Sequence, residues 1–222
     1  AYHSYWTNDP FLKKAFGNYL QKEYPQMEVE MSEWCELPCE HKIDTIEAGL
    51  IMARTISEDM ALTGVNSWSS WVGVNEGGEY ADSMIGANFD CSEYVISKRY
   101  YAMGHYSKFI PVGSHMVDFD ISVADVKAEK AWWKQWIDDK EYNVYLITNN
   151  MNVSCYKTPD GDYVAVIVNE GGDKEIKFNM LGYDMSVYTT DSEKNLELTS
   201  ESKGHKKLTV GEKSITTVVF SK

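Results

Sequence analysis

The chain has 222 residues, of which 43% are apolar and 13% aromatic, enough for one large or two small globular domains with a substantial core. Its 21 Lys and Arg against 34 Asp and Glu give a net charge of −13, which opposes binding to nucleic acid and to anionic membrane surfaces. No apolar run approaches the ~18 residues of a membrane span, and the first residues lack the basic and apolar regions of a secretory signal. We therefore expect a soluble chain that is mature, cut or begun at an internal start.

The first part of the chain predicts the end of a strand and then a helix. Residues 1–7 are typical of a strand end that runs into a polar tip. Asp9-Pro10 is a typical helix start, with Asp as N-cap and Pro at the first helical position, and Pro25 ends the helix. Between them, five apolar residues lie on one helical face: Leu12, Ala15, Phe16, Tyr19 and Leu20.

The next predicted strand is the extended run 27–33, M-E-V-E-M-S-E. Met27, Val29, Met31 and Glu33 share one parity, so a regular strand points Glu33 to the same side as three apolar residues. Barrel enzymes have their catalytic groups at the carboxyl ends of the strands, above the apolar barrel interior, and Glu33 would lie at such a position. The alternative is an ordinary surface Glu, and the two other acidic residues of the run conflict with a strand covered on both faces.

A helix follows this strand, and one more strand–helix unit comes after it. Apolar residues at helical spacing predict a long helix over 42–62, ended by Gly64, after which 65–71 forms a short strand. The segment 72–96 is rich in Gly, Asn and Asp and is predicted to be a long functional loop. Ser97 then caps a helix that runs to about residue 110 and is stopped by Pro111 and Gly113. This alternation of strands and helices predicts parallel strands in an α/β layer.

The remainder of the chain predicts an antiparallel β-sandwich. Turn signals at 159–162 and 170–173 separate short strands. We expect strands near residues 114–122, 143–149, 152–157, 162–169, 174–180, 184–190 and 214–220. A helix-like insert over 126–140 carries Trp132, Trp133 and Trp136, which either form a sugar-stacking platform or dock the helix on its own domain.

The cysteines are Cys35, Cys39, Cys91 and Cys155, too few for a disulfide framework in a chain of this length. Cys35 and Cys39 have a C-x3-C spacing, but no second pair or nearby double His completes a zinc set. We therefore expect a loop disulfide or free thiols at this pair, with the bridge formed if the protein is exported. Neither a metal nor another cofactor is expected.

Four blocks of sequence occur in a recognisable order: Y-H-S-Y-W at 2–6, M-S-E-W at 31–34, W-S-S-W-V-G-V-N-E-G-G at 68–78 and G-H-Y-S-K-F-I-P-V-G-S at 104–114. Two more segments, P-D-G-D-Y-V-A-V-I-V-N at 159–169 and S-I-T-T-V-V-F at 214–220, look like strands of a side β-domain. With these blocks the chain resembles the C-terminal half of glycoside hydrolase family 30, which includes glucocerebrosidase and bacterial endo-glycanases that act on xylans and β-1,6-linked glycans.

The resemblance implies a (β/α)8 TIM barrel fused to a β-sandwich. Residues 1–113 would be a partial barrel, about strands 6 to 8 with their helices, and residues 114–222 the antiparallel sandwich domain. It also implies hydrolysis with net retention of anomeric configuration by two carboxylates.

The resemblance assigns five site residues. Glu33 matches the nucleophile at the end of the seventh barrel strand, and Tyr5 matches the aromatic residue after the sixth, which hydrogen-bonds or packs near the nucleophile. Trp71, after the eighth strand, would form an apolar floor under the sugar at the cleavage point, and His3 and Trp34 would support the nucleophile directly. Alternatively, Tyr5 and Trp71 are rim packing and His3 is a structural histidine.

One half of the catalytic pair is missing. The acid/base Glu of the family lies in a local N-E-P pattern after the fourth strand, and no N-E-P occurs here; Asn75-Glu76 is followed by Gly77. We therefore expect a secreted retaining β-glycosidase half that needs the N-terminal half of the same barrel, or self-association, to cover its open face. The alternative is a non-catalytic carbohydrate-binding or interaction protein on the same scaffold.

Overall fold

The computed structural model describes residues 1–5, 9–76, 78, 82–118, 121–123, 129–135, 140–148, 150–204 and 207–222, with backbone only for 129–135 and 140–148. The chain forms two compact units. The first comprises Ala1–Tyr100 with Trp133–Tyr142, and the second comprises Tyr101–Trp132 with Asn143–Lys222.

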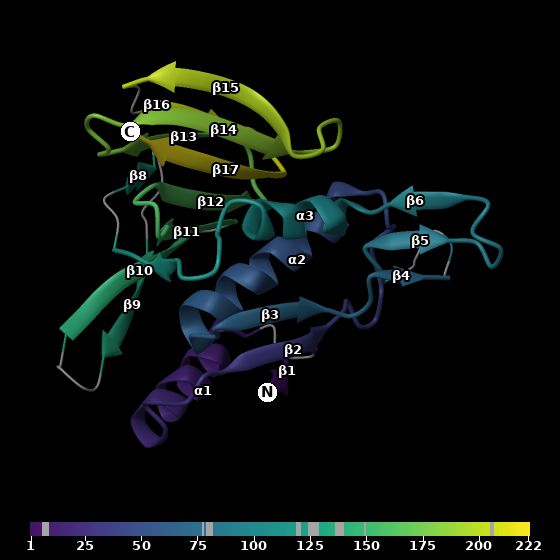
Figure 1. Cartoon of the computed structure of the whole chain (residues 1–222), viewed down its shortest axis with the longest axis horizontal. Coiled ribbons are helices and arrows are strands. Elements are labelled where there is room, and N and C mark those ends of the chain that lie inside the picture. The colour runs from purple at the N-terminus through teal and green to yellow at the C-terminus, as the bar shows by residue number, and fades with distance from the viewer. Residues whose placement is uncertain are drawn as a thin grey trace. The chain divides into compact units, whose positions relative to one another are not determined.

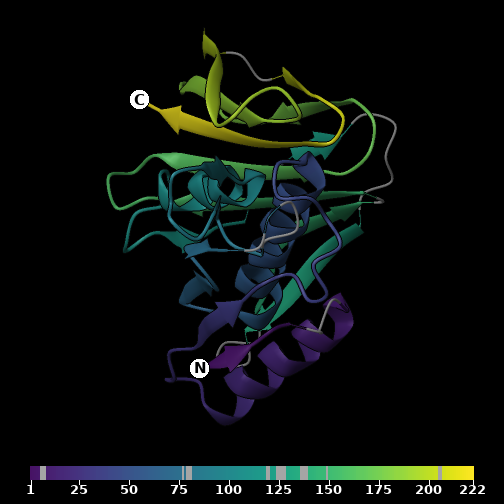
Figure 2. The ribbon, with the colours of Figure 1, turned by 90° about the vertical axis from the view of Figure 1, so that its right-hand side faces the viewer.

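A parallel sheet organises the first unit, in the order β1 (Tyr2–His3), β2 (Glu30–Trp34) and β3 (Ser67–Ser70). Helix α1 (Pro10–Glu23) connects β1 to β2, and helix α2 (Ile46–Glu58) leads from β2 towards β3. In Figures 1 and 2, α1 lies beside β1 at one edge of this sheet. The parallel strand–helix order predicted from the sequence is therefore confirmed.

Helix α1 begins where the sequence predicts, because the Asp9 side chain accepts a hydrogen bond from the Phe11 backbone N–H at 2.8 Å. Its buried side differs from its apolar side. The buried positions are Lys13, Gly17 and Leu20, while most of the apolar side chains are exposed: Phe11, Leu12, Phe16 and Tyr19. Gly17 explains why this side of the helix is the buried one, since only a residue without a side chain fits there: a Cβ at Gly17 would lie 2.2 Å from the backbone oxygen of Leu62.

Helix α2 is shorter than the predicted 42–62 and ends in a π-helical turn, Asp59–Thr63. Gly64 closes the turn with a φ of 77°, in the left-handed region that glycine adopts without strain. The π-helical turn places the Asp59 carboxylate in the interior of the unit. Asp59 accepts hydrogen bonds from Ser4 Oγ and Trp68 Nε1, both at 2.9 Å, and pairs with Lys13 Nζ at 2.9 Å. One buried carboxylate thus ties α1 and the β1 and β3 segments to the end of α2.

The segment 72–96 is not the structureless loop that the sequence predicts. It contains β4 (Val74–Asn75), β5 (Ile85–Ala87) and β6 (Tyr94–Ile96), which pair in a separate sheet of order β4-β5-β6. Strands of two or three residues are too short to show a periodic pattern. Helix α3 (Lys98–Ser107) follows, and Ser97 caps it as predicted, since its Oγ accepts from the Arg99 N–H at 3.0 Å.

The second unit is an antiparallel sandwich, as predicted. One sheet has the order β15-β14-β17-β12-β11-β10-β9 with β7 paired to β11, and the other has the order β16-β13-β8. The bounds are β7 (His115–Met116), β8 (Ile121–Val123), β9 (Glu129–Gln135), β10 (Lys140–Thr148), β11 (Met151–Lys157), β12 (Tyr163–Asn169), β13 (Lys174–Phe178), β14 (Asp184–Thr190), β15 (Glu197–Lys203), β16 (Lys207–Val210) and β17 (Ser214–Ser221).

The predicted helix-like insert over 126–140 is wrong over residues 129–135, which form strand β9. Its A-W-W-K-Q apolar pattern is too short to separate a helix from a strand. The side chains of Trp132 and Trp133 and the whole of Trp136 lie outside the described part, so the platform prediction stays open. The core of the sandwich is formed by aliphatic and aromatic side chains of both sheets: Val153, Ile167, Ile176, Phe178, Val187, Val218 and Phe220.

A histidine from the fourth sequence block is buried in the second unit. The His105 ring nitrogens contact Thr217 Oγ1 at 2.7 Å and Thr190 Oγ1 at 2.8 Å. Thr217 Oγ1 donates to the His105 backbone oxygen, and Thr190 Oγ1 accepts from the Leu196 N–H. Because the Thr217 hydroxyl donates to the His105 backbone oxygen, it accepts from Nδ1–H, and in the neutral ring Nε2 then accepts from the Thr190 hydroxyl. The histidine therefore joins α3 to β14 and β17 as a neutral imidazole, and burial lowers its pKa to about 3.

Candidate active site

Strand β2 carries one extra residue just before its carboxyl end. Tyr2 pairs with Met31 and His3 pairs with Glu33, so a single step along β1 corresponds to two steps along β2. Neighbouring residues of a strand point to opposite faces, whereas paired residues share a face. Met31 and Glu33 therefore point to opposite faces of the sheet, and Ser32 is the inserted residue of a β-bulge.

The pairing with β3 shows the same insertion from the other side. Met31 pairs with Trp68 and Trp34 pairs with Ser70, three steps along β2 against two along β3. Met31 and Trp34 thus share the face on which Trp68 donates to the buried Asp59, and both are buried. The prediction that Met31 and Glu33 face the same side is wrong, because it assumed a strand without a bulge.

The bulge brings three of the expected site residues together. The His3 Nδ1 atom lies 3.8 Å from Glu33 Oε1, an ion-pair distance when the imidazole is protonated, and their side chains are 46% and 30% exposed. The Tyr5 ring meets the His3 ring edge to face, with centroids 5.4 Å apart and an interplanar angle of 79°. These side chains lie at the carboxyl ends of β1 and β2, the end at which barrel enzymes carry out their chemistry.

The two expected tryptophans lie in different settings. Trp71 follows the carboxyl end of β3, its backbone N–H donates to the Trp34 oxygen at 2.7 Å, and the residue is 51% exposed. Trp34 is only 2% exposed and packs on Trp68, with ring centroids 5.7 Å apart. Trp71 is therefore accessible to a ligand at the edge that carries Glu33, whereas Trp34 supports the end of β2 from the opposite face.

The structure adds a buried ionic cluster that sequence reasoning missed. Glu36 lies three residues after Glu33, and its carboxylate contacts Arg99 Nη2 and His41 Nδ1. It also accepts from the backbone N–H groups of Glu40 and His41 at 3.2 and 3.3 Å. Glu36 and Arg99 are both buried, so each charge needs the other. The cluster fixes the loop that follows the nucleophile candidate to the first turn of α3. In the sequence, the only sign of this cluster is the single Arg in the first turn of α3.

The C-x3-C pair adjoins this cluster. All four cysteines lie in the described part of the chain and are free thiols, Cys35 buried and Cys39 partly buried. Burial raises the pKa of the Cys35 thiol to about 12 and also raises that of Cys39. In the described ranges, no group of His, Cys, Asp and Glu side chains is arranged to hold a metal ion.

No protein-family model and no curated protein matches the sequence. Solved structures do match. A conserved exported protein from Bacteroides fragilis has a TM-score of 0.70 and 21% identity over 98% of this chain and 45% of its own. A glycoside hydrolase family 30 endoxylanase from Clostridium papyrosolvens has a TM-score of 0.63 and 22% identity over 92% of this chain and 45% of its own.

A third structure, the catalytic domain of the family 30 xylanase C from Talaromyces cellulolyticus, has a TM-score of 0.63 and 17% identity over 89% of this chain and 41% of its own. The chain thus spans less than half the length of each of these proteins. It has the fold of part of a family 30 enzyme, a partial (β/α)8 barrel with a β-sandwich. None of the helices in the described ranges combines the length and apolar character that crossing a membrane requires.

Proposed function

We propose that this chain, which has part of the family 30 fold, is the C-terminal half of a retaining β-glycosidase with Glu33 as its nucleophile. The observation that carries the proposal is the bulge in β2. It turns Glu33 out of the buried face and places it beside His3 at the carboxyl end of the sheet. A regular strand would have pointed Glu33 into the buried side with Met31, where it would reach no substrate.

In this mechanism a Glu33 carboxylate oxygen attacks the anomeric carbon and the glycosidic C–O bond breaks. A second carboxylic acid, from the half of the barrel outside this chain, gives its proton to the leaving oxygen. It then takes a proton from water, which attacks the glycosyl ester and releases Glu33 with net retention. His3, 3.8 Å from Glu33, orients the carboxylate, and Tyr5 holds the His3 ring. The exposed Trp71 ring stacks on the bound sugar.

The partner in this proposal is the preceding half of the barrel, which would cover two features of the first unit. Among the strands that the structure describes, β1 is an edge of the parallel sheet, so its outer backbone groups have no neighbouring strand there. The exposed apolar face of α1, which carries Phe11, Leu12, Phe16 and Tyr19, flanks the same edge. The substrate is a β-linked glycan such as xylan or a β-1,6-linked glycan. Similarity to an exported protein supports secretion of the natural product.

The test uses the chain together with the preceding half of its natural barrel. Glu33→Gln should lower turnover of a β-linked glycan by about a thousandfold or more, because an amide cannot form the glycosyl ester. Glu28→Gln, an exposed carboxylate just before the same strand, is the matched control and should keep wild-type turnover. Both variants should keep the wild-type melting temperature.

Two results would contradict the proposal. Turnover of the purified Glu33→Gln variant above about a tenth of wild type would remove Glu33 from the nucleophile role. Glycan binding without hydrolysis in the full natural product would support a non-catalytic binding protein on the same scaffold. An activated 2-fluoro glycoside adds a direct readout, since the trapped sugar should appear by mass spectrometry on the peptide that contains Glu33.

A further inference from the structure

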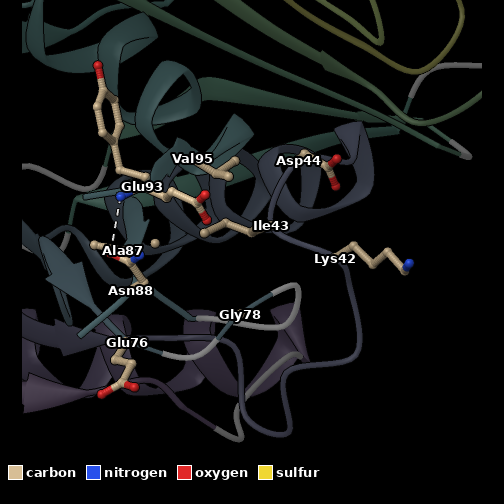
Figure 3. A pocket seen from close by; sticks show the side chains of 11 residues that line it. Lys42, Ile43, Asp44, Glu76, Gly78, Ala87, Asn88, Glu93 and Val95 are labelled. Carbon is tan, nitrogen blue, oxygen red and sulfur yellow. Dashed lines mark hydrogen bonds between the residues drawn. The ribbon is translucent and has the colours of Figure 1, made fainter. Parts of the chain in front are cut away.

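An open cavity of about 600 Å³ lies in the first unit, between the loop after β2 and the small sheet β4-β5-β6 (Figure 3). Its size is within the range of small-molecule sites. One wall is formed by residues 42–44 and the other by Glu76, Gly78, residues 86–88 and residues 93–95, and both segments follow the carboxyl ends of parallel strands. The cavity therefore opens in loops on the same side of the sheet as Glu33. None of the five site residues lines it.

The first wall is held in place by the Glu36 cluster. The contact of Glu36 with Arg99 and His41 fixes the segment directly before residue 42. The Lys98 N–H donates to the Ile43 oxygen at 3.1 Å, and the Ile43 side chain is buried. This wall is thus anchored to the start of α3 directly before residue 42 and again at Ile43. A site formed before its ligand arrives loses less ordering entropy on binding.

The second wall is held by the turn between β5 and β6. Asn88 Nδ2 donates to Ser92 Oγ, and the Ser92 hydroxyl and N–H both donate to Asp90 Oδ1. The Glu93 N–H donates to Asn88 Oδ1 at 3.1 Å. These bonds fix the turn and with it the cavity residues Glu93, Tyr94 and Val95. Tyr94 is 68% exposed, so its ring face is available for stacking.

The lining combines apolar and acidic groups. Val95 supplies apolar surface, and Figure 3 shows it with Ile43 and Glu93 among the side chains that line the cavity. Asp44, Glu76 and Glu93 supply three carboxylates against the single cation of Lys42 among the described lining residues. In Figure 3, Lys42 extends away from Glu93. Carboxylates accept hydrogen bonds from neutral hydroxyl donors and repel anions.

We propose that this cavity binds an uncharged segment of the glycan chain, remote from the bond that is cleaved, and rejects segments with acidic substituents. Stacking on Tyr94 and hydroxyl hydrogen bonds to the carboxylates supply affinity, and the negative charge supplies selectivity. The glycan class rests on the proposed function, whereas the selection against anions rests on the lining charges alone. The cavity would select which stretch of a decorated polymer is presented to Glu33.

The test measures binding to the 222-residue chain by calorimetry, with Glu33→Gln present throughout so that hydrolysis plays no part. The probes are neutral xylohexaose and the same oligosaccharide carrying one glucuronic acid. Neutral xylohexaose should bind about fivefold more tightly at low salt, and 0.5 M salt should reduce this preference. Glu93→Lys should reverse the preference.

Tyr94→Ala should weaken binding of xylohexaose by about fivefold. Phe89→Ala is the matched control, since Phe89 is an exposed aromatic in the same turn that does not line the cavity, and it should bind as wild type. Equal binding of both probes, no effect of Tyr94→Ala, or no binding of either probe would overturn the proposal. A different result is binding that follows these expectations while the Glu33→Gln chain, combined with the preceding barrel half, still hydrolyses the glycan. That result would support the cavity proposal and refute only the assignment of Glu33 as nucleophile.

Discussion

The His105 network predicts a specific loss of stability in mild acid. Burial lowers the pKa of the folded imidazole to about 3, against 6.5 as the ordinary value. Above pH 6.5 the folded and unfolded states are both neutral at this position, and the network contributes its full stability. As pH falls from 6.5 towards 3, the unfolded chain binds a proton that the folded chain cannot, so stability is lost over this window.

The size of the effect follows from the pKa difference. Each pKa unit corresponds to about 1.4 kcal/mol, so lowering the pH from 7 to 5 should cost about 2 kcal/mol through His105 alone. His105→Gln should be less stable than wild type at pH 7, because the Thr190 and Thr217 hydroxyls lose well-placed partners, at about 1–3 kcal/mol for each group left unpaired. The stability gap between wild type and variant should then narrow by about 2 kcal/mol at pH 5.

Urea unfolding of the 222-residue chain at pH 7, 6 and 5 measures this gap, and carboxylates that titrate in both proteins cancel in the difference. His115→Gln removes an exposed histidine of the same unit and should show no narrowing. An NMR titration of the folded chain should show no protonation of His105 down to pH 5. A constant gap, or an imidazole that titrates near pH 6.5 in the folded state, would refute the reasoning.

The remaining predictions concern the first unit. Gly17→Ala should destabilise it by about 2 kcal/mol, because the new Cβ would clash with backbone atoms of Leu62 and Thr63, which cannot move as a side chain can. Gly73→Ala is the control, since the space around Gly73 is open, and it should change the melting temperature little. The chain without the preceding barrel half should self-associate at micromolar concentration, and lysines in place of Leu12 and Tyr19 on the exposed face of α1 should reduce the mass measured by light scattering. A monodisperse wild-type monomer would contradict the second expectation.

The burial of Met31 changes which surface we expect to drive that self-association. Val29 and Met31 share the parity that the sequence predicts to face the barrel interior, so they would form part of its open face. Met31 is instead buried, because the bulge assigns it to the other face, while the strand neighbours Glu30 and Ser32 are exposed. The apolar surface that flanks the open edge at β1 is the exposed face of α1, so association at this edge should depend on that helix.

Features with local causes could be predicted from the sequence. The Asp9 cap, the Gly64 stop and the Ser97 cap each depend on the chemistry of one residue and its immediate neighbours, and all three are present. The residues at the end of β2 could be named, but not their orientation, because a bulge is defined by pairing with two other strands. Glu36 and Arg99 are 63 residues apart, and nothing local connects them.

Strands at the edge of the sandwich were also missed for a physical reason. The sequence E-L-T-S-E-S-K of β15 is almost wholly exposed, and β16 has only four residues. β15 lacks the apolar alternation that a half-buried strand shows, and the alternation of β16, K-L-T-V, is too short to identify a strand. Both are recognised only through their partners, β14 for β15 and β13 for β16.

The inserted residue in β2 separates two kinds of constraint on the sequence. Ser32 is exposed, and no described contact of its side chain fixes its chemistry, so its identity should be weakly constrained. Met31, Glu33 and Trp34 already alternate between the two faces when Ser32 is set aside, so loss of Ser32 alone would leave each of them on its present face. Regular pairing of all four residues would instead turn Glu33 to the buried face and Trp34 away from it. Homologues should therefore vary at position 32 both in the residue and in its presence, a pattern that an alignment scored by residue identity alone would read as an unimportant site.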